Sequence, residues 1–200
     1  MIERTITQIF PKSVIKSSHP DAEWHSDNIL EKISKLEMVK NTGNKTSKDN
    51  YVLNDSKFKT LRKAVQTELD LLMSKFYEQE KANLYITQSW FNVSEDDEFH
   101  HLHCHTNSII SGTMYLQTVE DDAILFTDQD LYMLRINILP TAKCPEVRLP
   151  VTKGDIVLFD SMVFHSVPKA KRKTKRISLS FNTFFTGEIG NKRELTELRL

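Results

Sequence analysis

The chain has 200 residues, of which 39% are hydrophobic and 27% are charged, and its formal net charge at pH 7 is zero. This length and hydrophobic content fit a globular domain with a sizeable core, and they exclude global disorder. A net charge of zero gives no overall attraction to nucleic acid or to a membrane surface. We therefore expect neither of them as a partner.

The cysteine content and the hydropathy pattern predict a protein of a reducing cytoplasm. Two cysteines, Cys104 and Cys144, are too few for a disulfide framework, and we expect Cys104 to be packed rather than to bind a metal. No apolar run approaches the roughly 20 residues of a membrane span, and the N-terminal segment MIERTITQIFPK lacks the apolar stretch of a signal peptide.

Residues 1–82 are predicted to form a helical supporting region. After a short strand at residues 5–10, two amphipathic helices are expected at residues 26–39 and 56–80, with a polar loop at 41–50 between them. The second helix carries an apolar stripe with spacings of three and four residues: Phe58, Leu61, Val65, Leu69, Leu72 and Phe76. Such a stripe is typical of a helix that packs against a sheet.

From residue 83 onward, strand signals follow one another closely. They are short, rich in β-branched and aromatic residues, and divided by polar, Pro or Gly residues: LYITQSWFNV, SIISGTMYLQT, AILFT, LYMLRINIL, EVRLP, DIVLFD, VFHSV and RISLSFNTFF. Helices followed by many strands predict an α+β, mainly β fold, in which residues 83–200 form a β-sandwich or barrel with the helices packed outside it. Residues 187–200 are expected to lie on this barrel.

The segment FHHLHCHTNS is the clearest candidate for a metal site. His101, His103 and His105 alternate along it, so an extended chain would place them on one face. Two imidazoles on one face can begin a metal site, and His165 is the candidate for a third ligand from a later strand. The pair can be His101 with His103 or His103 with His105. The alternative is a group of histidines that bind no metal.

The segment RISLSFN, which begins eleven residues after His165, carries a second group of functional side chains. Four polar residues share one face of this predicted strand: Arg176, Ser178, Ser180 and Asn182. The guanidinium of Arg176 can hold a carboxylate with two hydrogen bonds, and Ser178 can add a third. A metal site beside a carboxylate clamp suggests an organic acid as co-substrate. Alternatively, Arg176 belongs to the solvated basic run KAKRKTKR.

Taken in order, these segments resemble the Fe(II)- and 2-oxoglutarate-dependent oxygenase superfamily, in particular a small branch found in bacteria and marine phages. The matching pieces are Ser89-Trp90 with Asn92, His103 with His105, Ser111-Gly112 with Tyr115, Gly154 to Phe159, His165 with Val167, and Arg176 to Asn182. Each motif is weak alone, but the ordered series is specific. The resemblance covers residues 84–186 well.

The resemblance implies a double-stranded β-helix, the jelly-roll or cupin-like fold, with iron near one mouth of the barrel. It assigns three metal ligands: His103, His105 and His165. It assigns five residues to the 2-oxoglutarate site: Arg176 and Ser178 as the clamp for the distal carboxylate, with Asn92, Ser111 and Tyr115 lining the pocket. We expect loops at the barrel mouth to set substrate specificity, with candidates at 41–50, 94–99 and 139–150, and we expect Trp90 to be a core residue.

The implied activity is that of a dioxygenase that uses Fe(II), 2-oxoglutarate and O2 to hydroxylate a C–H bond, with release of succinate and CO2. The substrate would be an amino-acid side chain, with prolyl as the first guess, a metabolite or a nucleobase. It would act in the cytoplasm of a bacterium or of a phage-infected cell.

The chain departs from the superfamily at one position, because His stands where the usual His-x-Asp/Glu motif has its carboxylate. Three His ligands also suit zinc. Two alternatives therefore remain, a three-His cupin-type metalloenzyme that does not use 2-oxoglutarate and a non-catalytic jelly-roll binding module.

Overall fold

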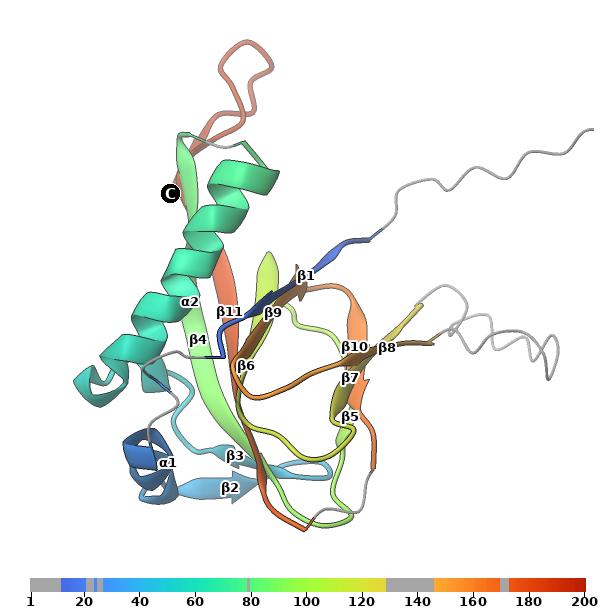
Figure 1. The fold of residues 1–200 in the computed structure, drawn as a ribbon. Helices are drawn as coiled ribbons and strands as arrows, with labels where there is room; N and C mark the ends of the chain where they lie inside the picture. Colours follow the sequence, from blue (N-terminus) through green and yellow to red (C-terminus); the bar gives the residue numbers. More distant parts are fainter. Residues whose placement is uncertain (1–11, 21–23, 25–26, 79, 129–145, 170–172) are drawn as a thin grey trace, which may run out of the picture.

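Figure 1 shows the fold in a computed structural model of the chain. The structure describes residues 12–20, 24, 27–78, 80–128, 146–169 and 173–200. The strands predicted for residues 5–10 and for LYMLRINIL lie outside these ranges.

Strands outnumber helices in the described part of the chain. The two α-helices are α1 (Asp27–Ser34) and α2 (Lys59–Leu71), and short helical turns cover Val52–Asn54, Ser56–Phe58 and Leu72–Phe76. The strands are β1 (Val14–Ser18), β2 (Met38–Lys40), β3 (Lys45–Ser47), β4 (Ala82–Ser94), β5 (His100–His103), β6 (Ile110–Gln117), β7 (Ala123–Thr127), β8 (Glu146–Pro150), β9 (Asp155–Asp160), β10 (Phe164–Val167), β11 (Arg176–Ile189) and β12 (Leu198–Arg199). No helix among the described residues is long and apolar enough to cross a membrane.

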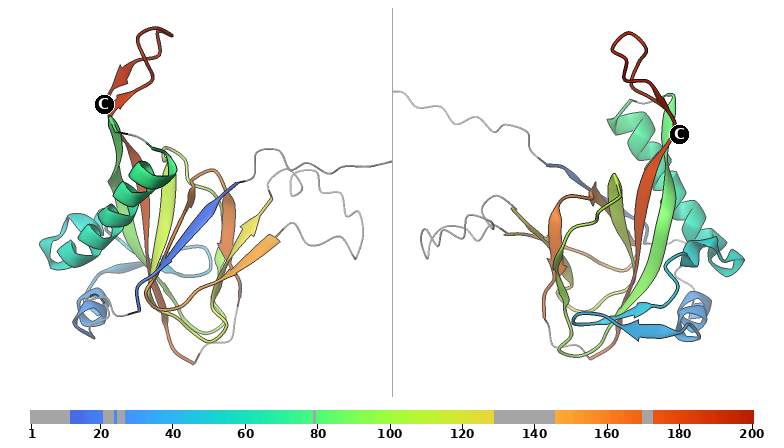
Figure 2. Two further views of the ribbon diagram at one scale, coloured as in Figure 1. Left: turned by 45° about the horizontal axis from the view of Figure 1, so that its top comes forward. Right: turned by 180° about the vertical axis from the view of Figure 1, so that it is seen from behind.

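Two antiparallel sheets face each other to form the barrel (Figures 1 and 2). The larger sheet has the strand order β1-β9-β6-β11-β4-β3-β2, and β12 pairs with β11. The smaller sheet has the order β5-β10-β7-β8. The mainly β fold predicted from the strand signals is therefore confirmed, as is the jelly-roll that the resemblance implies.

The outer face of the larger sheet forms the main hydrophobic core with α2. Phe91 of β4 and Phe181 of β11 are fully buried in the same apolar cluster as Leu61 and Leu69 of α2. The ring centroid of Phe91 lies 4.9 Å from that of Phe58. Because side chains alternate across a strand, this packing turns the intervening polar residues of β4 and β11 toward the barrel interior.

The apolar stripe of the second predicted helix is confirmed except at its end. Its first five members are buried, but Phe76 is 64% exposed. The segment Leu72–Phe76 is a π-helical turn, which contains more residues per turn than an α-helix and so changes the direction of the following side chains. Met73, which is 1% exposed, lies in the core instead.

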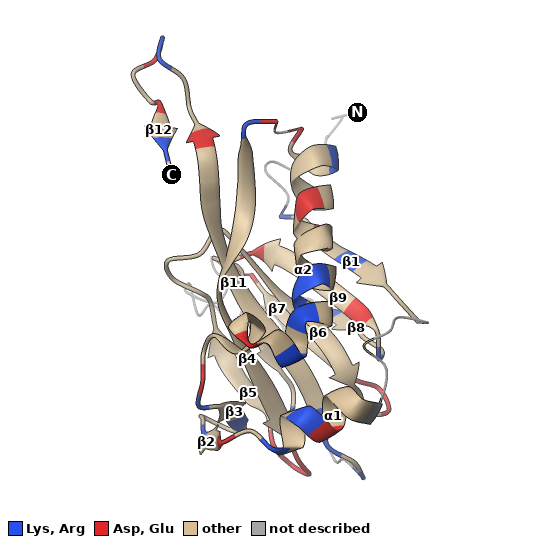
Figure 3. Cartoon of the chain, turned by 90° about the vertical axis from the view of Figure 1, so that its left-hand side faces the viewer, with Lys and Arg blue, Asp and Glu red and all other residues tan. Residues whose placement is uncertain are grey.

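Two other local predictions are wrong. The helix expected at residues 26–39 ends at Ser34, because Met38–Lys40 pair with β3 as a hairpin, and β3 in turn pairs with β4. The segment 41–50 is therefore not a plain loop. Figure 3 shows β2 and β3 at the lower end of the molecule near β5, and it shows Lys and Arg on the first turns of α2.

The C-terminal segment does not lie on the barrel as expected. β12 pairs with the end of β11, with Glu188 opposite Arg199, and this hairpin projects away from the sheets (Figure 1). Leu195 is 93% exposed and Leu198 is 49% exposed. The polar character of residues 187–200 is thus explained by solvent contact rather than by packing.

Gly112 of β6 illustrates how tightly the side chains of the neighbouring strands β9 and β11 pack against β6. A Cβ at this position would lie 2.8 Å from Cδ2 of Leu158 and would overlap the ring of Phe181. We expect Gly112→Ala to lower the free energy of unfolding by about 1–3 kcal/mol, as overpacked cores do, in a denaturant titration. Adding Phe181→Leu should recover part of this loss by making room. No recovery would show that overlap with Phe181 is not the cause.

Candidate metal centre and barrel interior

Three histidines converge at one mouth of the barrel. His103, the last residue of β5, pairs with His165 of β10, and their ring centroids are 4.4 Å apart. The prediction that His105 shares a strand with His103 is wrong, because β5 ends at His103. The N–H of His105 donates to the carbonyl of Ser161 at 2.8 Å, which returns its ring to the group. One potential ligand atom from each of the three histidines lies within 4.8 Å of the others.

Hydrogen bonds to the backbone fix the orientation of two of these rings. Nδ1 of His103 donates to the carbonyl of His101 at 2.8 Å, and Nδ1 of His165 donates to the carbonyl of Val163 at 3.0 Å. Because a carbonyl can only accept, the proton is on Nδ1 and the lone pair of Nε2 is available to a metal. Nε2 of His105 lies 3.3 Å from Nε2 of His165. Two nitrogens that share a zinc-sized ion tetrahedrally lie about 3.3–3.4 Å apart, so the donor set fits a divalent metal.

Burial keeps these imidazoles neutral, which is the form that binds metals. Burial, together with a smaller effect of the neighbouring imidazoles, lowers the pKa of His165 to about 3 and that of His105 to about 4. The pKa of His103 is lowered for the same first reason. At neutral pH no proton therefore has to leave these rings before a metal binds.

A second histidine group shares one member with the first. Potential ligand atoms of His100, His101 and His103 also lie within 4.8 Å of one another. With Nδ1 bonded to a carbonyl, His103 has one free nitrogen, so the two groups are alternative sites rather than simultaneous ones. The group with His165 is favoured, because that residue is buried and held by its own backbone bond.

The polar row predicted on β11 points into the barrel. Arg176, Ser178 and Asn182 are buried, whereas the intervening Leu179 and Phe181 belong to the outer core. The assignment of Arg176 to a solvated basic run is therefore wrong.

The residues opposite this row complete a polar interior. Ser178 pairs with Asn92 of β4 and with Tyr115 of β6, and Asn182 pairs with Ser111. The structure thus brings together the five residues predicted for the 2-oxoglutarate site on the inner face of one sheet.

The guanidinium of Arg176 is held from three sides. Its Nε donates to both carboxylate oxygens of Asp122 at 2.9 Å, its Nη1 donates to Oγ of Ser178 at 3.2 Å, and its Cζ lies 5.1 Å from the ring centroid of Tyr115. The role of Asp122 was not predicted. It lies in a polar turn, EDD, and nothing in that pattern distinguishes it from two exposed neighbours.

Three buried polar atoms in this interior have no hydrogen-bond partner among the described residues: Nη2 of Arg176, the hydroxyl of Tyr115 and Oδ1 of Asn92. Burial raises the pKa of the Tyr115 hydroxyl, so this group stays a donor. Buried polar groups are normally satisfied. Two unpaired donors beside each other on Arg176 and Tyr115 are what a bound carboxylate would require.

Ser111 has a different environment from the one predicted. Its hydroxyl donates to Oδ1 of Asn182 at 2.8 Å and contacts the hydroxyl of Ser161 at the same distance. Nδ2 of Asn182 in turn donates to Oε1 of Gln88 at 3.1 Å. This network joins β4, β6 and β11 behind the histidines, so Ser111 is placed to support the site rather than to be free for a ligand.

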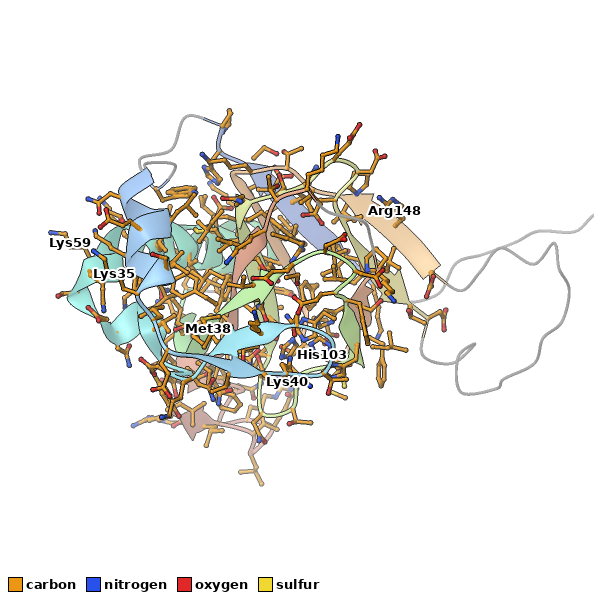
Figure 4. The ribbon with its side chains drawn as sticks, turned by 90° about the horizontal axis from the view of Figure 1, so that it is seen from below. Lys35, Met38, Lys40, Lys59, His103 and Arg148 are labelled. Carbon is orange, nitrogen blue, oxygen red and sulfur yellow. The ribbon has the colours of Figure 1, made fainter. Side chains whose placement is uncertain are left out.

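A cavity of about 370 Å³ opens beside the histidines. It is lined by side chains from the barrel mouth and from the N-terminal hairpin: Asn41, Thr46, Asn50, Gln88, Trp90, His100, His103, Cys104, His105, Thr106 and Asn182. Figure 4 shows His103 close to the β2–β3 hairpin. Trp90 and Cys104 therefore lie at a cavity wall, and the core role expected for Trp90 is wrong. Arg176 and Tyr115 do not line this cavity; they lie deeper in the barrel.

The comparisons with known proteins agree with this arrangement. Residues 88–182 match the model of a family described as "Putative 2OG-Fe(II) oxygenase". This segment contains both histidine motifs and the first half of β11, which begins at Arg176. These residues are therefore similar in sequence to the 2OG-Fe(II) oxygenase family. No curated protein matches the chain.

Several solved structures share the fold at low sequence identity. The non-heme alpha ketoglutarate dependent epimerase SnoN from nogalamycin biosynthesis has a TM-score of 0.64 at 12% identity, covering 88% of this chain and 80% of SnoN. HygX from Streptomyces hygroscopicus, solved with nickel and 2-oxoglutarate bound, has a TM-score of 0.63 at 12% identity, covering 86% and 82%. A Pseudomonas putida prolyl-4-hydroxylase has a TM-score of 0.56 at 16% identity, covering 86% and 92%. At such identities these likenesses show the fold alone.

Proposed function

We propose that this chain is an Fe(II)- and 2-oxoglutarate-dependent dioxygenase that hydroxylates a C–H bond of its substrate. The observation that carries the proposal is the pairing of two features in one barrel. Three neutral imidazoles converge at the mouth, and the buried Arg176, whose Nη2 has no hydrogen-bond partner among the described residues, lies deeper inside. A metal-bound keto acid with a distal carboxylate requires both features.

Each residue has a distinct task in this proposal. His103, His105 and His165 hold the metal through one nitrogen each and leave its other positions open. Arg176 binds the distal carboxylate of 2-oxoglutarate through Nη1 and Nη2, and the Tyr115 hydroxyl donates to the same group. When bound, the metal and 2-oxoglutarate supply the oxidising chemistry that uses O2 and releases succinate and CO2.

The cavity supports a polar but uncharged substrate. Its lining within the described chain holds four carboxamides, two threonines and Trp90, and no Asp, Glu, Lys or Arg. Carboxamides both donate and accept hydrogen bonds, so they suit hydroxyl or amide groups. Asn41 in the β2–β3 turn and Asn50 after β3 line this cavity, which supports segment 41–50 as a determinant of specificity.

The proposal is tested by adding Fe(II) and 2-oxoglutarate to metal-free protein without oxygen. We expect a weak visible charge-transfer band that needs both components. Admission of O2 should then consume 2-oxoglutarate and form succinate. Tight zinc retention with no band would favour the three-His cupin-type enzyme, and weak, substoichiometric metal binding would favour a binding module.

A further inference from the structure

A buried ion pair inside the barrel has no role in the proposal so far. Arg176 and Asp122 have side chains that are 3% and 2% exposed, and both carboxylate oxygens of Asp122 lie 2.9 Å from Nε of Arg176. The backbone holds Asp122 in place, because its N–H donates to the carbonyl of Val119 and its carbonyl accepts from Val151. Asp122 is thus a fixed charge.

A clamp for the distal carboxylate does not need this aspartate. Asp122 is a carboxylate bound to the same guanidinium, so it competes electrostatically with any second carboxylate there. It nevertheless leaves the edge formed by Nη1 and Nη2 open, since it occupies Nε alone. The arrangement accommodates a second carboxylate but weakens the attraction that draws it in.

The three histidine ligands proposed at the mouth of the barrel give a reason for the negative charge of Asp122. In a two-His-one-carboxylate site, the carboxylate ligand removes one of the metal's two positive charges. Here three neutral imidazoles remove none. A divalent metal and Arg176 together would carry three positive charges, one more than a 2-oxoglutarate dianion can neutralise. With Asp122 included, the sum is two.

We infer that Asp122 supplies, beside Arg176, the negative charge that a carboxylate ligand supplies on the metal in a two-His-one-carboxylate site. The inference rests on the proposed function, because it assumes the metal and the dianion. The negative charge thus lies beside the arginine instead of on the metal. The net charge of metal, Arg176 and Asp122 is then two, which the 2-oxoglutarate dianion neutralises.

The test uses Asp122→Asn, which keeps the shape and an oxygen acceptor for Nε but removes the charge. Two dissociation constants are measured by anaerobic calorimetry: that of Ni(II) for metal-free protein, and that of 2-oxoglutarate for Ni(II)-loaded protein. We expect Ni(II) to bind more weakly and 2-oxoglutarate to bind more tightly, each on the order of tenfold. The exposed neighbour, in the variant Asp121→Asn, is the matched control and should change neither constant.

The opposite directions distinguish charge from structure. An aspartate that merely holds the fold or orients Arg176 would, on removal, weaken both ligands or leave Ni(II) unchanged, and either result overturns the inference. If the wild-type protein binds Ni(II) but no 2-oxoglutarate, the proposed function fails, while the Ni(II) constant still decides whether Asp122 acts on the metal by its charge.

A second variant covers the case in which Asp122→Asn does not fold, since removal of one partner can leave a buried charge unpaired. His105→Asp restores the usual ligand set and leaves Asp122 untouched. Because the site then carries one negative charge too many, we expect 2-oxoglutarate to bind Ni(II)-loaded protein about tenfold more weakly than in the wild type. Equal or tighter binding would overturn the inference.

Discussion

Arg176→Lys is expected to weaken 2-oxoglutarate binding to the metal-loaded protein by about 30-fold or more. Lysine keeps the positive charge that the buried Asp122 requires, so the fold is not left with an uncompensated carboxylate. It cannot, however, offer a planar edge of two nitrogens to a second carboxylate. Truncation of one partner in a buried hydrogen-bonded charge pair typically costs about 2–5 kcal/mol, and 2 kcal/mol corresponds to about 30-fold.

The measurement is the dissociation constant of 2-oxoglutarate, and a shortened ligand locates the effect. 2-Oxopentanoate has the same keto acid end and no distal carboxylate, so its affinity should be nearly the same in Arg176→Lys and in the wild type. Arg148→Lys, at an exposed residue of β8, is the matched control. A variant that binds 2-oxoglutarate as the wild type does would remove Arg176 from the proposed clamp.

The sequence was most informative where residues with functional side chains alternate with apolar residues along a strand. The alternation of polar and apolar residues after Arg176 predicted one inward row, and the register of β11 with β4 and β6 confirms it. The alternation alone predicts the inward face of β11, because the apolar residues on its other face must pack in the hydrophobic core. The convergence of His165 with the earlier histidines also followed from residue type, since few other residues of the chain offer an imidazole near a strand.

Features that depend on long-range contacts were not predictable. Asp122 is recognisable as a site residue only in the folded chain, where the turn between β6 and β7 brings it into contact with Arg176. The two residues are far apart in the sequence, so the sequence does not show this contact. The hairpin β2–β3 was missed because its pairing with β4 outweighs the local helical pattern. Trp90 reads as a core residue by hydrophobicity, although the position of its strand at the barrel mouth places it at the cavity.

Removal of one imidazole from the proposed metal site should have the largest effect of all. His165→Ala is expected to lower the affinity for a divalent metal by more than the 10–100-fold that loss of an outer-shell partner causes. Turnover should fall below detection, because the metal is then absent at working concentrations. His101→Ala is the matched control: His101 belongs to the other histidine group, so it should retain both metal and activity if the group with His165 is the site.

The thermal midpoint gives a reading that does not depend on activity. A metal that binds the folded state at about 1,000 times its dissociation constant adds about 4 kcal/mol, which for a chain of this size raises Tm by roughly 10 °C. Wild type and His101→Ala should show this rise with Co(II) or Zn(II), and His165→Ala should not. The reverse pattern would place the metal on the group of His100, His101 and His103. Because His103 has one free nitrogen and belongs to both groups, its own substitution cannot separate these two sites, whereas the pair His165 and His101 can.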